Sequence, residues 1–294
     1  MSRVELVEVG PRDGLQNEKT QIPTAQKIEL VDSLSAAGFN LIEATSFVSP
    51  KWVPQLGDAG EVMAGIRRQD EVRYIVLTPN KKGLDGALAA GVDEVAVFGA
   101  ATEGFSQHNI NCSIAESLDR FRPVVGEALA AGVRVRGYIS VVVQCPYEGA
   151  VAPESVLALA EELLAIGCYE VSLGDTTGQG TQQSICTLLD RLCARLPAAK
   201  LAGHFHDTNH QAVANVMQAL SYGLRRFDAA IAGLGGCPYA PGAKGNVNTK
   251  LLHDALLAAG WQTGLDRDKL IAAEQVVAAM GLNRTTTDKG AEAR

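Results

Sequence analysis

Short, almost continuous runs of apolar residues alternate along the chain with longer segments in which apolar residues recur every three or four positions. The short runs include VELVEV, YIVLT, EVAVFGA and YISVVV. Runs of this kind are typical of parallel strands whose faces are covered by helices. They predict eight strands, at residues 3–9, 41–47, 73–78, 94–100, 134–143, 169–174, 201–206 and 226–233.

The longer segments have the spacing of amphipathic helices. Helices are predicted between the strands, at residues 25–37, 58–68, 80–90, 114–131, 154–166, 181–195 and 210–222, and two more follow the last strand, at 248–259 and 267–280. Several of them end in a glycine, such as Gly91 and Gly167, that leads directly into the next apolar run. Glycine at that place supplies the left-handed backbone that ends a helix.

This repeat predicts one α/β domain over residues 1–294, a (β/α)8 TIM barrel with extra C-terminal helices in residues 248–282. Eight strand–helix units within about 250 residues match the size of such a barrel. The alternative is an open, doubly wound sheet, which usually has a G-x-G-x-x-G stretch after its first strand. That position holds GPRDGLQ here, so the barrel is favoured.

Composition and charge narrow the function. The formal net charge is −7 and no run of positive residues exceeds a pair, which argues against a nucleic-acid partner. No window contains the roughly 18 apolar residues of a membrane span, and the first residues, MSRVELVEVGPRDG, lack the pattern of a signal or transit peptide. The six cysteines include no C-x-x-C pair, so we expect reduced thiols and a cytoplasmic location. Homo-oligomerisation is left open.

Polar and ionisable residues gather where the apolar runs stop, which in a parallel barrel is the end that carries the active site. Arg12 and Asp13 follow the first strand, and His204 and His206 lie in the seventh. Residues two apart in a strand point to the same side of the sheet. A carboxylate with two imidazoles and no thiolate suits Mg²⁺ or Mn²⁺. The alternative is a hydrogen-bonded pair of histidines that lines the barrel.

Two further features have both a structural and a catalytic interpretation. Glu43 lies in an apolar run and needs a buried partner, and Arg12 beside a metal ligand would stabilise an oxyanion; the two could equally form an ion pair that joins two strands. The glycine-rich loop at residues 233–249, GLGGCPYAPGAKGNVNT, contains Cys237. A thiol on a loop that closes over a site can transfer a proton, whereas a buried thiol only packs.

Together these motifs resemble the HMG-CoA lyases, which belong to the metal-dependent lyase and synthase barrels named after an Asp-Arg-Glu trio. The matching stretches keep the family order from residue 8 to about residue 249 and include EVGPRDGLQNE, IEATSFVSPKWVPQLGD, FGAATEGFSQHNINCSI, GCYEVSLGDT, HFHDT and AGLGGCPYAPGAKGN. The resemblance implies an acyl-CoA substrate: 3-hydroxy-3-methylglutaryl-CoA, or a close 3-hydroxy-3-alkylglutaryl-CoA, cleaved to acetyl-CoA and acetoacetate. Such a reaction serves leucine degradation and ketone-body formation.

The resemblance also implies roles for individual residues. The implied ligands of a divalent cation, Mg²⁺ or Mn²⁺, are Asp13, His204, His206 and the amide oxygen of Asn246. The implied catalytic residues are Arg12 on the thioester oxygen, Glu43 as its orienting partner, and Asp175, His204 and Cys237 in proton transfer. The implied substrate-binding residues are Arg12, Gln16, Ser172, Arg136, Asn283 and Arg284.

The sequence departs from the family pattern at Asn209-His210, after HFHDT, and at Lys250, which replaces an acidic residue beyond the loop. These changes bear on the choice of acyl group. The main alternative function on the same barrel is a Claisen-condensing acyltransferase of the isopropylmalate synthase type. Those enzymes usually carry H-x-H-N-D, whereas Asp207 follows His206 directly here.

Overall fold

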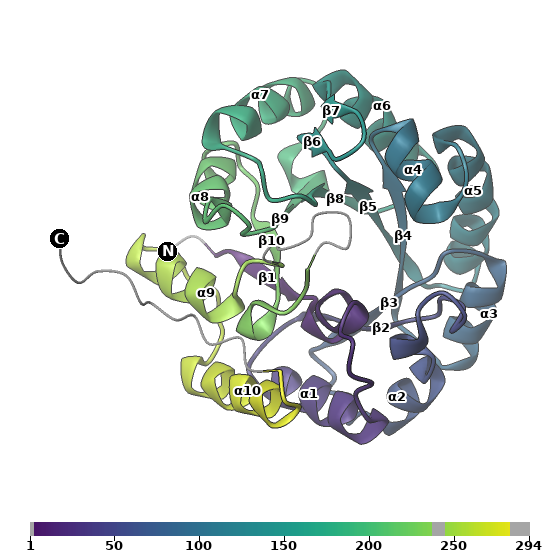
Figure 1. Ribbon diagram of the computed structural model, residues 1–294, viewed down its shortest axis with the longest axis vertical. Coiled ribbons are helices and arrows are strands. Elements are labelled where there is room, and N and C mark those ends of the chain that lie inside the picture. Colours follow the sequence, from purple (N-terminus) through teal and green to yellow (C-terminus); the bar gives the residue numbers. More distant parts are fainter. Residues whose placement is uncertain (1–2, 237–244, 283–294) are drawn as a thin grey trace.

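Eight parallel strands close into a barrel in a computed structural model that describes residues 3–236 and 245–282 (Figure 1). Their order around the ring is β1-β10-β9-β8-β5-β4-β3-β2. The strands are β1 Glu5–Glu8, β2 Leu41–Ser46, β3 Arg73–Leu77, β4 Glu94–Ala100, β5 Arg134–Ser140, β8 Glu170–Asp175, β9 Leu201–Phe205 and β10 Arg226–Ala229. The ring closes where β1 pairs with β10, with Glu8 opposite Ala229. The predicted barrel is confirmed.

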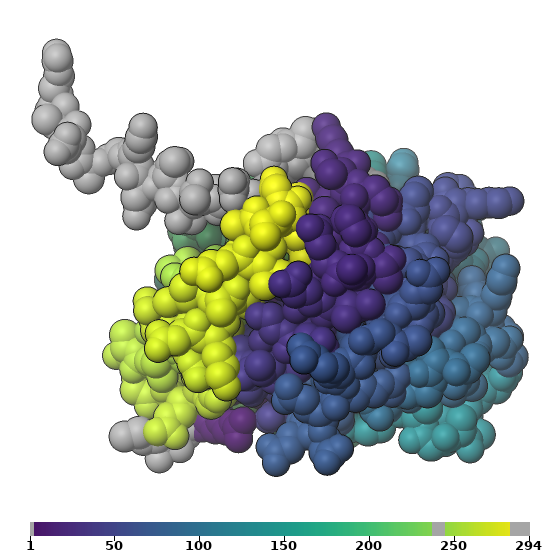
Figure 2. All heavy atoms as spheres, turned by 90° about the horizontal axis from the view of Figure 1, so that it is seen from below, coloured from purple at the N-terminus to yellow at the C-terminus, as the bar shows by residue number. Residues whose placement is uncertain are grey.

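Helices surround the barrel, as Figure 1 shows. They are α1 Thr24–Ala36, α2 Ala59–Gly65, α3 Lys81–Ala89, α5 Ile114–Ala130, α6 Pro153–Ala165, α7 Gln182–Cys193, α8 Ala212–Ser221, α9 Thr249–Ala258 and α10 Arg267–Ala279. The last of these packs beside α1, so the C-terminal part of the chain lies against its beginning (Figure 2). Within the described part of the chain, no helix combines the length and the apolar character needed to cross a membrane.

Three short elements were not predicted: α4 Glu103–Ile110 and the hairpin of β6 Gln144–Cys145 and β7 Gly149–Ala150. Their apolar content is too small to give a periodic signal. Side-chain contacts fix them instead: the Thr102 hydroxyl donates to the Cys145 thiol, and the His108 and Tyr147 rings stack with centroids 3.9 Å apart. His108, Asn109 and Ile110, at the end of α4, add to one wall of the barrel mouth.

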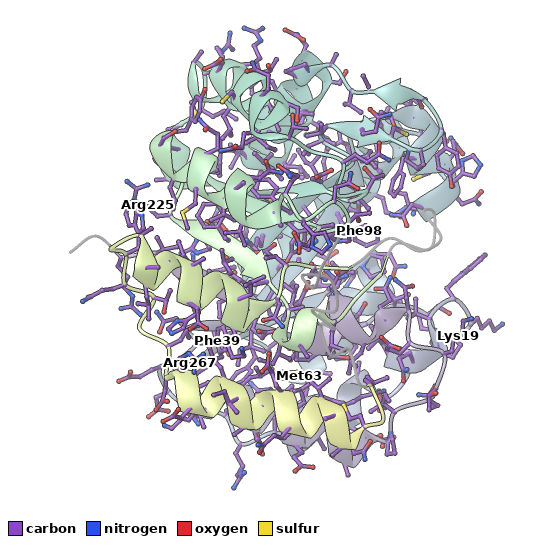
Figure 3. All side chains as sticks on the ribbon, turned by 60° about the vertical axis from the view of Figure 1, so that its left-hand side comes forward. Lys19, Phe39, Met63, Phe98, Arg225 and Arg267 are labelled. Atoms are coloured by element: carbon purple, nitrogen blue, oxygen red, sulfur yellow. The ribbon has the colours of Figure 1, made fainter. Side chains whose placement is uncertain are left out.

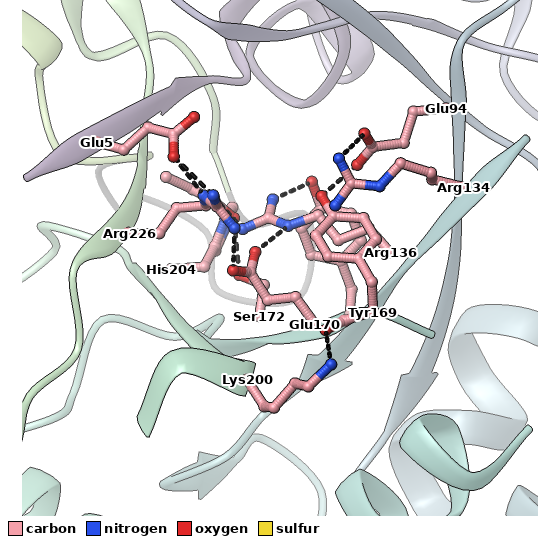
Figure 4. Close-up of polar contacts among 12 residues, drawn as sticks. Glu5, Glu94, Arg134, Arg136, Tyr169, Glu170, Ser172, Lys200, His204 and Arg226 are labelled. Carbon is pink, nitrogen blue, oxygen red and sulfur yellow. Dashed lines mark hydrogen bonds and ion pairs between the residues drawn. The ribbon is translucent and has the colours of Figure 1, made fainter. Parts of the chain in front are cut away.

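The amino-terminal end of the barrel is closed by a buried network of charges (Figure 4). Arg136 donates to Glu170 at 2.9 Å and to Asp228 at 2.8 Å, and Arg226 pairs with Glu5 at 2.6 Å. Large apolar residues such as Phe39 and Met63 fill the layer between strands and helices (Figure 3). Because ion pairs close the amino-terminal end of the barrel, a site can form only at the carboxyl-terminal end of the strands.

Candidate active site

An unusually wound turn directly after β1 carries two of the predicted site residues. The segment Gly10–Gly14 is a single turn of π-helix, in which the N–H groups of Asp13 and Gly14 both donate to the Val9 carbonyl, at 2.8 and 3.1 Å. Such turns are rare and are frequent at functional sites. A Cβ added to Gly14 would lie 2.6 Å from the Cβ of Leu234, so this position requires glycine. The turn places Arg12 and Asp13 at the barrel mouth.

Asp13 meets the two histidines of β9 and its end, as predicted. One ligand atom from each of Asp13, His204 and His206 lies within 4.8 Å of the other two. The two imidazole Nε2 atoms are 3.3 Å apart, and His204 Nε2 is 4.0 Å from Asp13 Oδ2. Adjacent ligand atoms about 2.1 Å from one octahedral ion are about 3 Å apart, so the cluster has the dimensions and the donor types of a divalent-cation site.

The protonation of this cluster also suits a cation. Burial and the nearby His204 lower the pKa of His206 to about 4, which leaves a neutral ring with a free lone pair at neutral pH. Burial alone would raise the pKa of Asp13, but Arg12, the two histidines and the Asn246 hydrogen bond together outweigh it and hold that pKa well below its usual range. Asp13 and His206 therefore offer a carboxylate and a neutral imidazole, the forms in which these side chains bind metals. The pKa of His204 is raised instead, because Asp228 and Asp13 outweigh its burial.

Asp228, a residue that we did not predict, holds His204 from beneath. Its Oδ2 is 3.1 Å from His204 Nδ1, which directs Nε2 toward Asp13 and His206. A carboxylate on the far nitrogen of a ligating histidine fixes the ring and its tautomer. Burial would raise the pKa of Asp228, but Arg136 and His204 together lower it to about 2. The sequence signal was an acid inside the apolar run RFDAAIAG, the same signal that pointed to Glu43.

Asn246, the fourth predicted ligand, also reaches the cluster. It is buried, and its backbone bridges to that of His206. Its side-chain nitrogen donates to Asp13 Oδ2 at 2.7 Å and to the Leu234 carbonyl at 3.2 Å. The Asn246 amide thus contacts the Asp13 carboxylate through its nitrogen. A half-turn about the Cβ–Cγ bond of Asn246 would exchange the two amide atoms and bring the oxygen, the predicted ligand atom, to the same position.

Arg12 and Glu43 form the ion pair that the sequence left open, and they form it at the mouth. Both Arg12 Nε and Nη2 lie 2.7 Å from Glu43 Oε2, and Arg12 Nη1 donates to Asp13 Oδ1 at 2.7 Å. Burial would lower the pKa of Arg12, yet the two carboxylates outweigh it and raise that pKa. A guanidinium held on two sides and facing a cavity is a fixed positive charge, which is what a developing oxyanion requires.

These groups open into a cavity of about 940 Å³. Arg12, Asp13, His204 and His206 line one side of it, with Gln16, whose Oε1 is 3.5 Å from Arg12. The wall contributed by β3, β4 and β5 is more apolar and contains Leu77, Phe98 (labelled in Figure 3), Tyr138 and Ile139. The rim carries Lys19, Trp52 and Arg120, none of which was predicted. Trp52 is 83% exposed there, and Lys19 extends outward (Figure 3).

Three predicted residues lie behind the cavity wall instead of on it. Ser172 donates to Asp228 at 2.8 Å, and Arg136 is fully buried in the network of Figure 4. Both side chains lie deeper in the barrel, because they precede by two residues the strand positions Tyr138 and Gly174 that line the cavity. Asp175 accepts from the Gly180 N–H at 2.8 Å, and burial raises its pKa to about 6. It holds the loop after β8. Cys237, Asn283 and Arg284 lie outside the described residues.

The two departures from the family pattern lie apart from the cation cluster. Asp207 accepts from the Ala212 N–H at 3.1 Å at the start of α8, and His210 lies 3.7 Å from Asp207. Lys250 points toward Glu274 of α10, 4.0 Å away. Neither change places a new charge among the proposed ligands.

Comparisons with known proteins agree with the fold described above. The HMGL-like family model matches residues 3–277. A hydroxymethylglutaryl-CoA lyase of Bos taurus mitochondria is 52% identical over 99% of this chain and 89% of its own length. A 3-hydroxy-3-isohexenylglutaryl-CoA/hydroxymethylglutaryl-CoA lyase of Pseudomonas aeruginosa is 53% identical over 99% and 97%. The crystal structure of the HMG-CoA lyase from Brucella melitensis is 55% identical and superposes with a TM-score of 0.94, covering 95% of this chain and 99% of that one.

Proposed function

This chain belongs to the HMGL-like family, and from that premise we propose that it cleaves 3-hydroxy-3-methylglutaryl-CoA to acetyl-CoA and acetoacetate. One observation supports the chemistry above all. Asp13, His204, His206 and Asn246 converge beside the fixed charge of Arg12 at the mouth of the barrel. Relatives named as lyases of this substrate match the chain over nearly its full length.

Asp13, His204, His206 and Asn246 would hold a divalent cation, Mg²⁺ or Mn²⁺, because the set offers oxygen and imidazole donors and no thiolate among the described residues. A cation there would polarise the C3 hydroxyl and orient the acyl carboxylate. Arg12 would bind the thioester oxygen and stabilise the enolate that leaves when the C2–C3 bond breaks. Glu43 and Asp13 keep the guanidinium aimed at that oxygen.

Two proton transfers complete the reaction. The C3 hydroxyl proton must go to a base. His204, Asp13 and Asp175 are the candidates, and of these Asp13 and His204 line the cavity whereas Asp175 does not. We therefore assign this step to the Asp13–His204 pair, in which His204 Nε2 lies 4.0 Å from Asp13 Oδ2. Cys237, outside the described residues, is the proposed acid that protonates the enolate carbon.

The rim and the apolar wall support proposals about the rest of the substrate. Lys19 and Arg120 bring two cations to the cavity edge, where the phosphates of the coenzyme A arm would lie, and exposed Trp52 offers a stacking face for the adenine. The apolar wall around Phe98 and Leu77 favours an alkyl group on C3. One relative is named for both methyl and isohexenyl substrates, and a longer 3-alkyl group is the second candidate.

Purified protein, HMG-CoA and Mg²⁺ provide the test. We expect acetoacetate and acetyl-CoA in equal amounts, loss of both in EDTA, and recovery with Mg²⁺ or Mn²⁺. Full cleavage by metal-free protein would contradict the cation site. Free CoA released from acetyl-CoA and a 2-oxo acid, without cleavage of HMG-CoA, would instead favour the Claisen-condensing function. Competition between HMG-CoA and its 3-isohexenyl homologue measures which alkyl groups on C3 the enzyme accepts.

We further propose a cytoplasmic location. The bovine relative is named mitochondrial, but the five described cysteines of this chain, Cys112, Cys145, Cys168, Cys186 and Cys193, all have free thiols. Free thiols in every described cysteine fit a reducing compartment.

A further inference from the structure

We propose that Glu8, the last residue of β1, is a positioning residue that holds two ligand-bearing segments in fixed relation to one another. These segments are the turn Gly10–Gly14, which carries Asp13, and residues 245–249, which include Asn246. The inference rests on the proposed cation site and adds to it a residue that touches neither cation nor substrate.

The carboxyl group of Glu8 joins three separate parts of the chain. Its Oε1 accepts from the N–H of Gly10, at 2.8 Å, and from the N–H of Ile231, also at 2.8 Å. Its Oε2 accepts from the hydroxyl of Thr249 at 2.7 Å. Gly10 begins the catalytic turn, Ile231 begins the short helix Ile231–Gly233 before the glycine-rich loop, and Thr249 is the first residue of α9 after it. One side chain thus binds the turn and both flanks of the loop.

Packing does not explain an acid at this position. Glu8 is fully buried, and its hydrogen-bond partners in the described part of the chain are two backbone N–H groups and a hydroxyl, none of them charged. Burial without a charged partner raises its pKa to about 7. An apolar residue of similar volume would avoid that cost. The carboxyl group is thus required for its capacity to accept several hydrogen bonds.

The fit around Glu8 is close. A Cβ added to Gly10 would lie 2.6 Å from Glu8 Oε1, so the glycine allows the turn to approach the carboxyl group. On the other side, the Ala230 N–H donates to the Val247 carbonyl at 3.0 Å, and the Thr249 N–H donates to the Ala230 carbonyl at 3.1 Å. The segment that ends at Thr249 is therefore fixed to the end of β10 and to Glu8 together.

This arrangement controls the distance between two proposed ligands. Thr249 follows Asn246 by three residues, and the Asn246 amide is 2.7 Å from Asp13 Oδ2. Release of Thr249 or of the turn from Glu8 would let the two segments move apart. Ligand sites tolerate displacements of only about 0.5 Å. A cation would therefore bind more weakly once the two segments are released from Glu8, even though no ligand has been removed.

The test measures Mn²⁺ affinity, by electron paramagnetic resonance of free Mn²⁺ in titrations of the full chain without substrate. We expect Glu8→Ala to bind Mn²⁺ about 10- to 100-fold more weakly, as is usual when a group that supports a ligand is lost. Thr249→Val should bind about fivefold more weakly, and Thr249→Ser, which keeps the hydroxyl, should match wild type. Glu8→Gln should stay within about twofold, because its amide oxygen still accepts from both N–H groups.

Glu94→Gln is the matched control. Glu94 is also fully buried, but it pairs with Arg73 at 2.6 Å near the closed end of the barrel. This variant should lose thermal stability and keep wild-type Mn²⁺ affinity. Wild-type affinity in both Glu8→Ala and Thr249→Val, with a lower Tm alone, would overturn the inference. If Glu8→Ala does not fold, the difference between Thr249→Val and Thr249→Ser decides. A wild-type protein that binds no Mn²⁺ overturns the proposed site and this inference together.

Discussion

Replacement of Glu8 by Gln should change how the stability of the protein depends on pH. Burial raises the pKa of Glu8 from 4.5 to about 7 in the folded state, while the unfolded chain keeps the ordinary value. Between these two values the folded protein binds a proton that the unfolded chain has lost. The contribution of Glu8 is therefore fully present below pH 4.5 and is lost as the pH rises through about 7.

The size of the effect follows from the two pKa values. A change from 4.5 to about 7, at 1.36 kcal/mol for each unit, corresponds to about 3 kcal/mol of unfolding free energy. Glutamine resembles the neutral acid and cannot lose a proton. The difference in unfolding free energy between Glu8→Gln and wild type should thus grow in favour of the variant, by up to about 3 kcal/mol between pH 4.5 and pH 8.

Urea denaturation of both proteins at several pH values, in EDTA to remove any bound cation, measures this difference. Glu61→Gln provides the control for the loss of one carboxylate, because Glu61 lies exposed on α2. Parallel stability curves for wild type and Glu8→Gln would refute the reasoning. They would mean that Glu8 ionises in the folded protein as freely as in the unfolded chain.

Three further changes test the site. Arg12→Gln should reduce turnover by about 10²- to 10³-fold, because the variant cannot stabilise the oxyanion. Its Tm should also fall, because Glu43 is left buried without its partner. An unchanged kcat would show that Arg12 takes no part in the chemistry. Cys237→Ala should reduce kcat by about 10²- to 10⁴-fold with little change in Tm, and wild-type kcat would leave its thiol without a catalytic role. Asp228→Asn should weaken Mn²⁺ binding about 10- to 100-fold, since His204 loses its charged support; the same Mn²⁺ titration that tests Glu8 would show whether it does.

The sequence predicted the barrel because the repeat of strand, helix and glycine is local and can be counted. It also predicted that Asp13, His204 and His206 would meet, because every strand of such a barrel ends at the same face. The roles of Asp228 and Glu8 could not be read in this way. Both are acids inside apolar runs. The partners of Asp228 come from β5, β8 and β9, and those of Glu8 from the turn after β1, the helix Ile231–Gly233 and α9. These elements meet only when β1 pairs with β10 and closes the ring.

Side-chain direction was the other limit. The family resemblance implied that Ser172 and Arg136 line the pocket. How deep these side chains lie in the barrel depends on the offset between neighbouring strands. Ser172 pairs in register with Tyr138 and Ala202, and its side chain lies one layer below the mouth. The sequence could not predict the π-helical turn after β1 either, because its conformation depends on the close approach of Gly14 to Leu234.

The distribution of charge along the barrel axis explains why a cation would bind at one end only. At the closed end, acids and bases in the described residues pair off: Glu5, Glu94 and Glu170 against Arg73, Arg134 and Arg226. Nearer the mouth, the guanidinium partners of the Asp13, Glu43 and Asp228 carboxyl groups among the described residues are Arg12 and Arg136, and Arg136 is shared with Glu170 of the closed end. This layer has an excess of acid, and two imidazole nitrogens face each other within it. A divalent cation bound there would meet both that excess and the carboxylate of an incoming acyl group, whereas at the closed end it would have to displace an arginine.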